Sequence, residues 1–286
     1  MDKFKLGIVG HGFVGKAVAY GFTHPKVDQF YCDPKHNTNI DELCDWDPIA
    51  TFVCAPTPMR EDGTVDATIV EDAVLKLLQH TKSFIIIKST ITPPVLERIM
   101  MTASMSAHSS ISESEGRICY NPEFLTENNA LEQFIRMKLQ VFGGTTEACR
   151  YAEFLYNQFS MCKMEKVIRM PAVEASFVKY AINSYLAMKV TFFNQLYDTV
   201  QDYGAQYNMI INAVESDERI GSSHNRVPGY DGKRGFGGAC LPKDSKAFTK
   251  ITKHLTLLEE AITINNGYRS QYELDEREKS NNVNYG

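Results

Sequence analysis

Short β-rich runs alternate with helical runs from Phe4 to Phe142, and this alternation constrains the fold more than any other feature of the sequence. Alternating strands and helices are typical of a parallel, doubly wound α/β sheet. The pattern therefore predicts an N-terminal α/β domain over residues 1–170. The expected strands are Lys5–Val9, Gln29–Cys32, Thr51–Cys54, Phe84–Lys88, Arg117–Tyr120 and Leu139–Phe142, and the expected helices lie near Phe13–Thr23, Ala67–Leu78, Pro94–Met101, Thr126–Phe134 and Glu147–Phe159.

The run Gly10-His11-Gly12-Phe13-Val14-Gly15 follows the first expected strand and opens the first expected helix. In this position a G-x-G-x-x-G run is the dinucleotide-binding fingerprint of a Rossmann-type domain. Gly10 permits a tight turn, Gly12 lets the backbone approach a pyrophosphate, and Gly15 allows close packing of helix on strand. The helix N-terminus then faces the negative phosphates. The loop predicts a dinucleotide cofactor.

An acidic residue, Asp33, ends the second expected strand. A carboxylate at this spacing from the glycine loop suits a hydrogen bond to the adenosine ribose, and it would repel the 2′-phosphate of NADP. Asp33 therefore predicts NAD as the cofactor. The alternative is an aspartate that forms a turn before Pro34.

After Pro171 the alternation ends, and residues 172–203 contain neither proline nor glycine. Apolar side chains occupy most of the circumference of this stretch, which predicts one long helix buried on several sides. We expect it to be the centre of an all-helical domain over residues 171–286 and a homodimer interface. Further helices are expected at Lys243–Leu255 and Leu257–Tyr272, and the polar end from Leu274 is expected to be a frayed tail.

Composition excludes several classes of function. A net charge of −5 argues against a general nucleic-acid surface. The seven cysteines are scattered without Cys-x-x-Cys spacing, so we expect neither a disulfide framework nor a metal site. No apolar run approaches the ~20 residues that span a bilayer, and Met1–Lys5 leads directly into a strand. These features predict a cytoplasmic protein without a membrane partner.

One thiol stands out, in the run Gly235-Phe236-Gly237-Gly238-Ala239-Cys240-Leu241-Pro242-Lys243-Asp244. Glycine leaves the backbone room to approach a ligand closely. Cys240 precedes an expected helix, where the positive end of the helix dipole favours the thiolate and makes cysteine a nucleophile. The alternative is a glycine-rich surface loop that holds an inert, buried cysteine.

The order of residues in that loop resembles the catalytic loop of the UDP-glucose and GDP-mannose 6-dehydrogenase family. Other segments resemble further signatures of this family, in the same order along the chain. Two positions depart from them, since Pro93-Pro94 replaces the family Pro-Gly and Gln195 replaces a glutamate. The similar segments are Gly10–Gly15, Cys54–Pro58, Lys88–Thr90, Asn121–Leu125, the helix around Lys179 and Asn183, and Arg219–Gly221.

The resemblance implies a four-electron oxidation of the C6 alcohol of a nucleotide sugar by two NAD+, through an aldehyde to a carboxylate. Cys240 would attack the aldehyde, and Lys179 and Asn183 would stabilise the oxyanions. Asp244 and Glu123 would manage water and protons, and Thr90 would position the hydroxyl or the water. The implied NAD contacts are Gly10, Gly12, Phe13, Val14, Gly15, Asp33, Thr57, Thr90, Glu127 and Lys243. The implied sugar-nucleotide contacts are Glu123, Phe124, Leu125, Glu127, Lys179, Asn183, Arg219, Tyr230 and Gly237.

Members of this family normally carry a third, C-terminal domain that holds the nucleotide of the substrate, and no strand–helix–strand pattern follows Tyr272. We therefore expect a short form, which binds substrate unaided or with a separate chain. UDP-glucose is the expected substrate and GDP-mannose the nearest alternative. Two other hypotheses remain. One is a two-electron hydroxyacid dehydrogenase of the 6-phosphogluconate type, which would not need Cys240. The other is an NAD-binding remnant without catalysis.

Overall fold

The computed structural model describes residues 3–106, 116–125 and 129–286. Within them the chain forms two compact units. The first unit consists of Met1–Thr57 and Asp66–Lys179, and the second of Pro58–Val65 and Tyr180–Gly286.

The boundary between the units lies inside helix α8 (Ala172–Asp202), whereas the sequence pattern predicts it at residue 170. Ala172 and Ala175 are buried in the core on one face of the sheet, and the Ser176 hydroxyl donates to the carbonyl of Ile91 at 2.7 Å. The start of α8 thus packs onto the first unit. A change in the local pattern marks where an element type changes, but it does not reveal which core that element joins.

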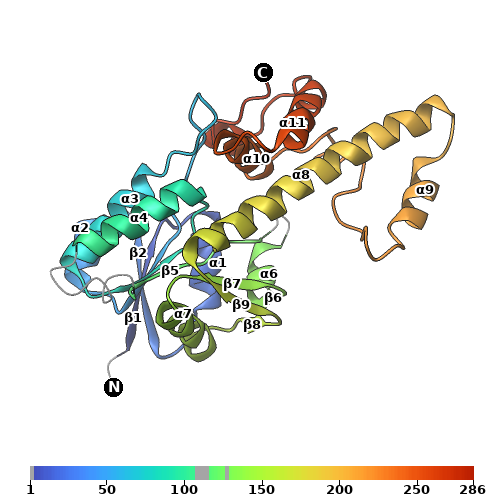
Figure 1. The fold of residues 1–286 in the computed structure, drawn as a ribbon. Helices are drawn as coiled ribbons and strands as arrows, with labels where there is room; N and C mark the ends of the chain where they lie inside the picture. Colours follow the sequence, from blue (N-terminus) through green and yellow to red (C-terminus); the bar gives the residue numbers. More distant parts are fainter. Residues whose placement is uncertain (1–2, 107–115, 126–128) are drawn as a thin grey trace. The chain divides into compact units, whose positions relative to one another are not determined.

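A seven-stranded sheet forms the first unit, with its strands in the order β2-β1-β3-β4-β5-β7-β9 (Figure 1). Neighbouring strands are parallel except β5 and β7, which pair antiparallel between Tyr120 and Gly143. The sheet is thus mixed and not fully parallel as predicted, because alternation alone does not fix the direction of a strand near the edge. The strands are β1 (Phe4–Val9), β2 (Val27–Cys32), β3 (Ala50–Val53), β4 (Phe84–Ile87), β5 (Ile118–Tyr120), β7 (Gln140–Gly143) and β9 (Val167–Met170), and β6 (Arg136–Met137) pairs with β8 (Lys163–Met164) in a separate two-stranded sheet.

Helices cover both faces of the sheet, as a doubly wound fold requires (Figure 1). Strand β4 reads Phe-Ile-Ile-Ile and every residue is buried, as expected for a parallel strand covered on both faces. Helices α2 (Ile40–Trp46), α3 (Thr68–His80) and α4 (Pro93–Ser106) contribute side chains to the core on one face. Helices α1 (Phe13–Gly21), α6 (Ala130–Ile135) and α7 (Thr146–Phe159) contribute to the core on the other. Most predicted elements of this unit are confirmed, whereas α2, β6, β8 and β9 were not expected.

The second unit is helical and is built on the remainder of α8, as predicted (Figure 1). One small core forms where Tyr180 of α8 packs with Phe248 and Leu258. A second forms where Phe193 and Val200 pack with α9. The other helices are α9 (Tyr207–Val214), α10 (Leu241–Lys250), α11 (Thr256–Arg269) and α12 (Glu276–Ser280).

Helix α8 is less enclosed than its composition predicts. Phe177, Tyr185 and Phe192 are exposed by 45%, 57% and 59%. Large apolar side chains that are exposed on a helix are compatible with the predicted homodimer interface, which stays a prediction.

The frayed C-terminal tail predicted from Leu274 is wrong. Asp275 caps helix α12 through a capping box, and Glu278, Val283 and Tyr285 are buried. The segment is polar in composition because its anchor is a buried ion pair between Glu278 and Arg269 at 2.7 Å, not an apolar stripe. A prediction from polar composition alone therefore gave a solvated tail where the segment is ordered.

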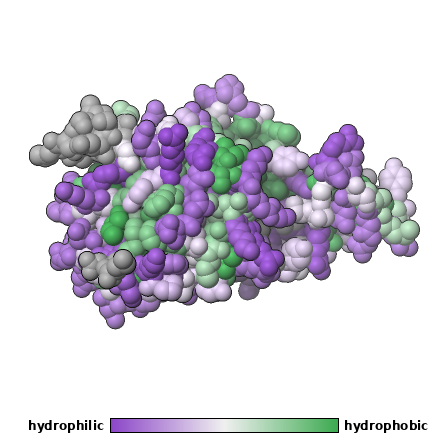
Figure 2. All heavy atoms as spheres, turned by 90° about the horizontal axis from the view of Figure 1, so that it is seen from below, coloured by the Kyte–Doolittle hydropathy of each residue, from purple (hydrophilic) through white to green (hydrophobic). Residues whose placement is uncertain are grey.

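Figure 2 shows that hydrophilic residues cover most of the face in view, with hydrophobic residues grouped in patches between them. In the part of the chain that the structure describes, no helix is both long and apolar enough to cross a membrane.

Candidate functional site

The glycine loop lies at the carboxyl end of β1, where the strand order reverses between β1 and β3. Gly10 has a positive φ of 84°, its N–H donates to the carbonyl of Cys32 at 2.9 Å, and a Cβ there would lie 2.7 Å from the carbonyl oxygen of Cys54. Only glycine fits this turn without strain. Ligands of open α/β sheets bind at such a reversal, so the loop occupies the expected position for a cofactor.

The loop fits the pyrophosphate of a dinucleotide. Gly12 is the N-cap of α1, and a Cβ at Gly12 would meet no atom within 4 Å, so open space lies beside the backbone there. A Cβ at Gly15 would overlap the carbonyl oxygen of Gly10, which explains the close packing of helix on loop. The first intrahelical bond runs from the N–H of Lys16 to the carbonyl of Gly12 at 3.0 Å, so the preceding turn can face an anion.

Two substitutions in this loop separate binding from folding. Gly12→Ala is expected to weaken NAD binding at least about tenfold and to change the free energy of unfolding by less than about 1 kcal/mol, because the open space beside it is where a pyrophosphate would approach. Gly15→Ala is expected to lower the free energy of unfolding by about 3 kcal/mol, because its Cβ meets backbone. Calorimetric NAD titration and urea unfolding measure the two effects. Wild-type NAD affinity in Gly12→Ala would contradict this placement of the cofactor.

Asp33 joins the end of β2 to the glycine loop. Its carboxylate accepts hydrogen bonds from the N–H groups of His11 at 2.7 Å and Lys35 at 2.9 Å. Partial burial acts to raise the pKa of Asp33, but these two hydrogen bonds and the nearby cations outweigh it, so the pKa lies below its usual value. The carboxylate therefore stays charged beside the glycine loop. Asp33 also caps the 3-10 turn Pro34–His36. The turn-forming role that was predicted as the alternative is therefore present together with the bond to the glycine loop.

A buried polar cluster lies at the carboxyl ends of β4 and β5. The ammonium of Lys88 lies 3.1 Å from Oε2 of Glu123 and donates to Oδ1 of Asn121 at 3.2 Å. Oε1 of Glu123 accepts the backbone N–H groups of Phe124 at 2.6 Å and Leu125 at 2.8 Å. Both carboxylate oxygens of Glu123 thus hold protein groups in place, and the ion pair fixes the loop after β5.

Lys179 extends from the first-unit end of α8 toward that loop. Its buried ammonium donates to the carbonyl oxygen of Glu123 and lies 5.4 Å from the centre of the Phe124 ring. An ammonium has three hydrogens, so this bond leaves donors for a second acceptor. The structure therefore places Lys179 beside Glu123 and Phe124, three residues that the sequence assigned to one site.

In the second unit, Cys240 is exposed and is the N-cap of α10, as predicted. Asp244, in the first turn of α10, is buried and contacts two further predicted residues. Its Oδ1 lies 2.6 Å from the ammonium of Lys243, and its Oδ2 accepts from the amide of Asn183 at 2.6 Å. The structure thus brings Asn183 of α8 together with Lys243 and Asp244, which follow the thiol by three and four residues in the sequence.

The other predicted residues are placed as follows. Phe13 and Val14 open α1, and Thr57 and Thr90 follow β3 and β4, with Thr57 buried and Thr90 partly buried. Arg219 and Tyr230 are exposed. Arg219 pairs with Asp217 at 2.6 Å, and Tyr230 stacks on Arg226. A Cβ at Gly237 would collide with the guanidinium of Arg269. Glu127 lies outside the described residues.

Sequence reasoning missed several residues that build these sites. Lys88 was considered only as the end of an expected strand and as part of the family-like segment Lys88–Thr90, although a lysine at the end of an apolar strand is itself a signal of a buried ion pair. Arg269 and Glu278 gave no signal at all. Among the residues that the structure describes, no group of three or more His, Cys, Asp or Glu side chains could hold a metal ion.

Comparison with known proteins gives a consistent family. Residues 45–160 match the NAD binding domain of the UDP-glucose/GDP-mannose dehydrogenase family, and residues 173–267 match its central domain. The UDP-glucose 6-dehydrogenase AglM of Haloferax volcanii is 27% identical over 92% of this chain and 70% of AglM. The UDP-glucose 6-dehydrogenase TuaD of Bacillus subtilis is 29% identical over 76% of this chain and 46% of TuaD.

A solved structure extends this result to three dimensions. The UDP-glucose dehydrogenase from the hyperthermophilic archaeon Pyrobaculum islandicum has a TM-score of 0.75 and 25% identity, over 93% of this chain and 68% of that chain. The matches with several curated relatives span less than half of each relative's length, such as the 46% of TuaD. More than half of each of these relatives thus lies outside the region that matches this chain.

Proposed function

The chain belongs to the UDP-glucose/GDP-mannose dehydrogenase family, and from this premise we propose that it oxidises the C6 alcohol of a nucleotide sugar to a carboxylate with NAD. UDP-glucose is the proposed substrate and UDP-glucuronate the product. One observation carries the proposal: an exposed cysteine occupies the N-cap position of α10, and Lys243 and Asp244 of the first turn of that helix form a buried group with Asn183 of α8. A hydride transfer alone would not need this thiol.

Cys240 supplies covalent catalysis in this proposal. When bound, NAD accepts a hydride in each of the two oxidations. The sulfur of Cys240 bonds to the aldehyde carbon and forms a thiohemiacetal, which becomes a thioester when it loses a hydride and a proton. Water then adds to the thioester carbon, the carbon–sulfur bond breaks, and the thiol and the carboxylate are released. The N-terminus of α10 favours the thiolate needed for the first attack.

Lys179 and Asn183 are proposed to stabilise the oxyanions. Each already makes one hydrogen bond, Lys179 to the carbonyl of Glu123 and Asn183 to the carboxylate of Asp244. Each also keeps further N–H groups, because an ammonium has three and an amide has two. The existing bonds fix the side chains before a substrate arrives, which is what electrostatic preorganisation requires.

Glu123 and Asp244 differ from the simple picture of solvent-facing bases. Oε2 of Glu123 pairs with Lys88, its Oε1 accepts two backbone N–H groups, and Asp244 pairs with Lys243. We propose that the main role of Glu123 and Asp244 is to hold the side chains and backbone groups bonded to them in place. Proton transfer by Glu123 and Asp244, and the role of Thr90, stay predictions.

Substrate contacts and assembly are also proposals. Phe124, Leu125, Arg219, Tyr230 and Gly237 are proposed to contact the sugar nucleotide. The exposed aromatic side chains of α8 are the proposed homodimer surface. A separate substrate-binding chain and a cytoplasmic location stay predictions.

Asp33 is proposed to select NAD over NADP, and Asp33→Ala tests this. Loss of the carboxylate removes both the ribose acceptor and the charge that repels a 2′-phosphate. We expect NAD affinity to fall about tenfold and the ratio of NADP to NAD affinity to rise by at least as much. Titration of both cofactors measures this. Because the pKa of Asp33 is lowered, NADP rejection by the unaltered chain should persist below the usual aspartate pKa near 3.8. An unchanged NADP-to-NAD ratio in the variant would contradict the assignment.

The proposed activity is tested by incubating the purified chain with NAD and one candidate substrate at a time, while NADH absorbance is recorded. UDP-glucose and GDP-mannose test the two family substrates, and 6-phosphogluconate tests the two-electron alternative. We expect NADH with UDP-glucose. NAD binding without reduction, whatever the nucleotide sugar, would contradict the proposal and favour a non-catalytic remnant.

A further inference from the structure

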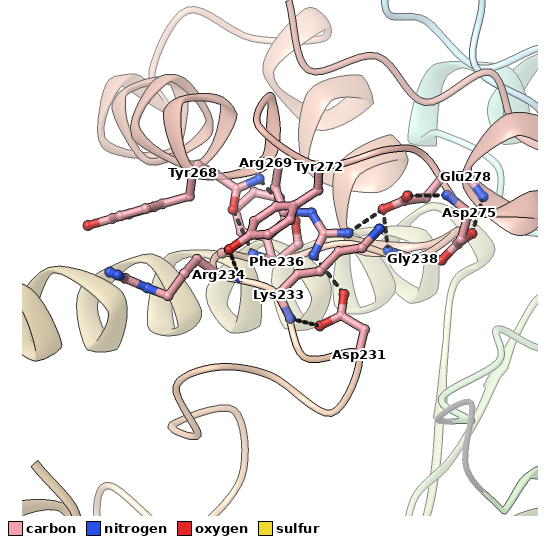
Figure 3. Close-up of polar contacts among 12 residues, drawn as sticks. Asp231, Lys233, Arg234, Phe236, Gly238, Tyr268, Arg269, Tyr272, Asp275 and Glu278 are labelled. Carbon is pink, nitrogen blue, oxygen red and sulfur yellow. Dashed lines mark hydrogen bonds and ion pairs between the residues drawn. The ribbon is translucent and has the colours of Figure 1, made fainter.

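The C-terminal segment Asp275–Tyr285 holds the backbone of the Cys240 loop (Figure 3). Glu278 is fully buried, and its Oε1 accepts the N–H of Gly238 at 3.1 Å, Nη2 of Arg269 at 2.7 Å and the hydroxyl of Tyr285 at 2.6 Å. Its Oε2 accepts the N–H of Asp275 at 2.9 Å. One carboxylate thus joins the loop to the end of α11 and to α12.

Arg269 balances the charge of this buried carboxylate. The guanidinium is 1% exposed and lies between Glu278 and Asp231, whose Oδ2 is 2.6 Å from Nη1 (Figure 3). It can lie there only because Gly237 has no side chain, since a Cβ would collide with it. The glycine of the loop therefore makes room for the arginine that keeps Glu278 charged.

Side chains hold the loop at three points before the thiol. The N–H of Gly235 donates to Asn194 at 3.0 Å, and the N–H of Phe236 donates to Asn265 at 2.6 Å. The third point is the bond from Gly238 to Glu278, two residues before Cys240. A loop rich in glycine has few side chains to pack, so these hydrogen bonds take the place of a packed core.

Of these three hydrogen bonds, the one from Gly238 is expected to contribute most to fixing the loop, because its acceptor is charged. Burial acts to raise the pKa of Glu278, but the hydrogen bonds from Tyr285 and Asp275 and the charge of Arg269 outweigh it and the pKa is lowered. Charge-assisted hydrogen bonds are about twice as strong as neutral ones. Glu278 is thus suited to fix the position of the loop.

We propose that Glu278, held by Arg269, is a positioning residue for Cys240. It keeps Gly238 in the conformation that places the thiol at the N-terminus of α10, where the helix dipole activates it. The inference rests on the proposed function only in taking Cys240 as the nucleophile. In this proposal the segment Asp275–Tyr285 supports the loop that carries Cys240.

Three variants of Glu278 separate positioning from stability. Glu278→Ala removes the bond to the loop and the charge. Glu278→Gln keeps an oxygen that can accept from Gly238 but removes the charge. Glu278→Asp keeps the charge but is one methylene shorter, so it withdraws from Gly238. The matched control is Asp231→Asn, which removes the other carboxylate on Arg269 and has no bond to the loop.

The readout is the rate at which iodoacetamide alkylates Cys240, followed by peptide mass spectrometry. Circular dichroism and thermal unfolding check folding in parallel. We expect alkylation to slow about fivefold in Glu278→Ala and Glu278→Asp, which corresponds to ~1 kcal/mol. We expect an intermediate slowing of about twofold in Glu278→Gln, which keeps the bond to Gly238 but not its charge. We expect Asp231→Asn to be alkylated at the rate of the unaltered chain, although both variants melt at lower temperature. We expect kcat to fall in the same variants in which alkylation slows, and we expect the KM for NAD to stay unchanged in all of them.

Wild-type alkylation in folded Glu278→Ala would overturn the proposal, and if that variant does not fold, wild-type alkylation in Glu278→Asp would do so. Equal slowing in Asp231→Asn and Glu278→Asp would also overturn it, since general destabilisation would then explain both. The result is independent of turnover. If the unaltered chain oxidises no nucleotide sugar but the alkylation rates follow the expected order, the proposed function fails and the positioning role stands.

Discussion

Cys240→Ala is expected to abolish formation of the uronate, with turnover lowered at least about 10³-fold and NAD affinity unchanged. Cys240 lies at the N-cap of α10 in the second unit, whereas the glycine loop lies in the first. The substitution removes the proposed nucleophile and leaves every residue of the glycine loop as it is. Chromatography of the nucleotide sugars after long incubation measures the product, and calorimetric titration measures NAD binding.

The matched control is Cys162→Ala, which removes a thiol that no step of the mechanism uses. Burial raises the pKa of Cys162 to about 11, so this thiol is protonated at neutral pH. We expect at least half of the unaltered turnover in this variant. Uronate formed by Cys240→Ala at a rate near that of the control would contradict covalent catalysis and favour the two-electron hydroxyacid hypothesis.

Asp244→Ala is expected to lower the free energy of unfolding of the second unit by about 3–5 kcal/mol. The carboxylate of Asp244 is buried against the ammonium of Lys243 and the amide of Asn183, at 2.6 Å from each. Its removal leaves a buried ammonium without its partner carboxylate, which is the costly way to break an ion pair. Turnover should fall as well, because Asn183 loses the bond that orients it. Urea unfolding and NADH production measure the two effects.

A double variant tests the physical reason. Lys243→Met with Asp244→Leu replaces both charges by apolar groups, and buried pairs replaced in this way often keep their stability. We expect the double variant to recover at least half of the unfolding free energy lost in Asp244→Ala, while activity stays low. Asp244→Ala with the stability of the unaltered chain would show that the pair contributes nothing to this unit.

The first unit was largely predictable because its signals are local. Each strand is a short apolar run, and the glycine loop combines a positive φ at Gly10 with a close contact at Gly15, both of which demand glycine in the sequence itself. The antiparallel pairing of β5 with β7 was not predictable, because the direction of a strand depends on where the connecting chain returns.

The second unit was harder to predict because distant polar groups hold it together. The order of α12 depends on a bond from Glu278 to Arg269 and another to Gly238, and neither produces a periodic pattern. Cys240 was recognisable from its neighbours, yet the residues that hold its loop were not. Sequence thus identified the chemical groups of the candidate site better than the groups that position them.

The most direct test of the central claim is the number of NADH molecules formed for each UDP-glucose consumed by the purified chain. Absorbance gives NADH, and chromatography gives UDP-glucose and UDP-glucuronate in the same sample. Oxidation of an alcohol to a carboxylate removes four electrons, so we expect two NADH for each UDP-glucuronate and no accumulated aldehyde. One NADH for each UDP-glucose, with the sugar left at the aldehyde, would contradict the account.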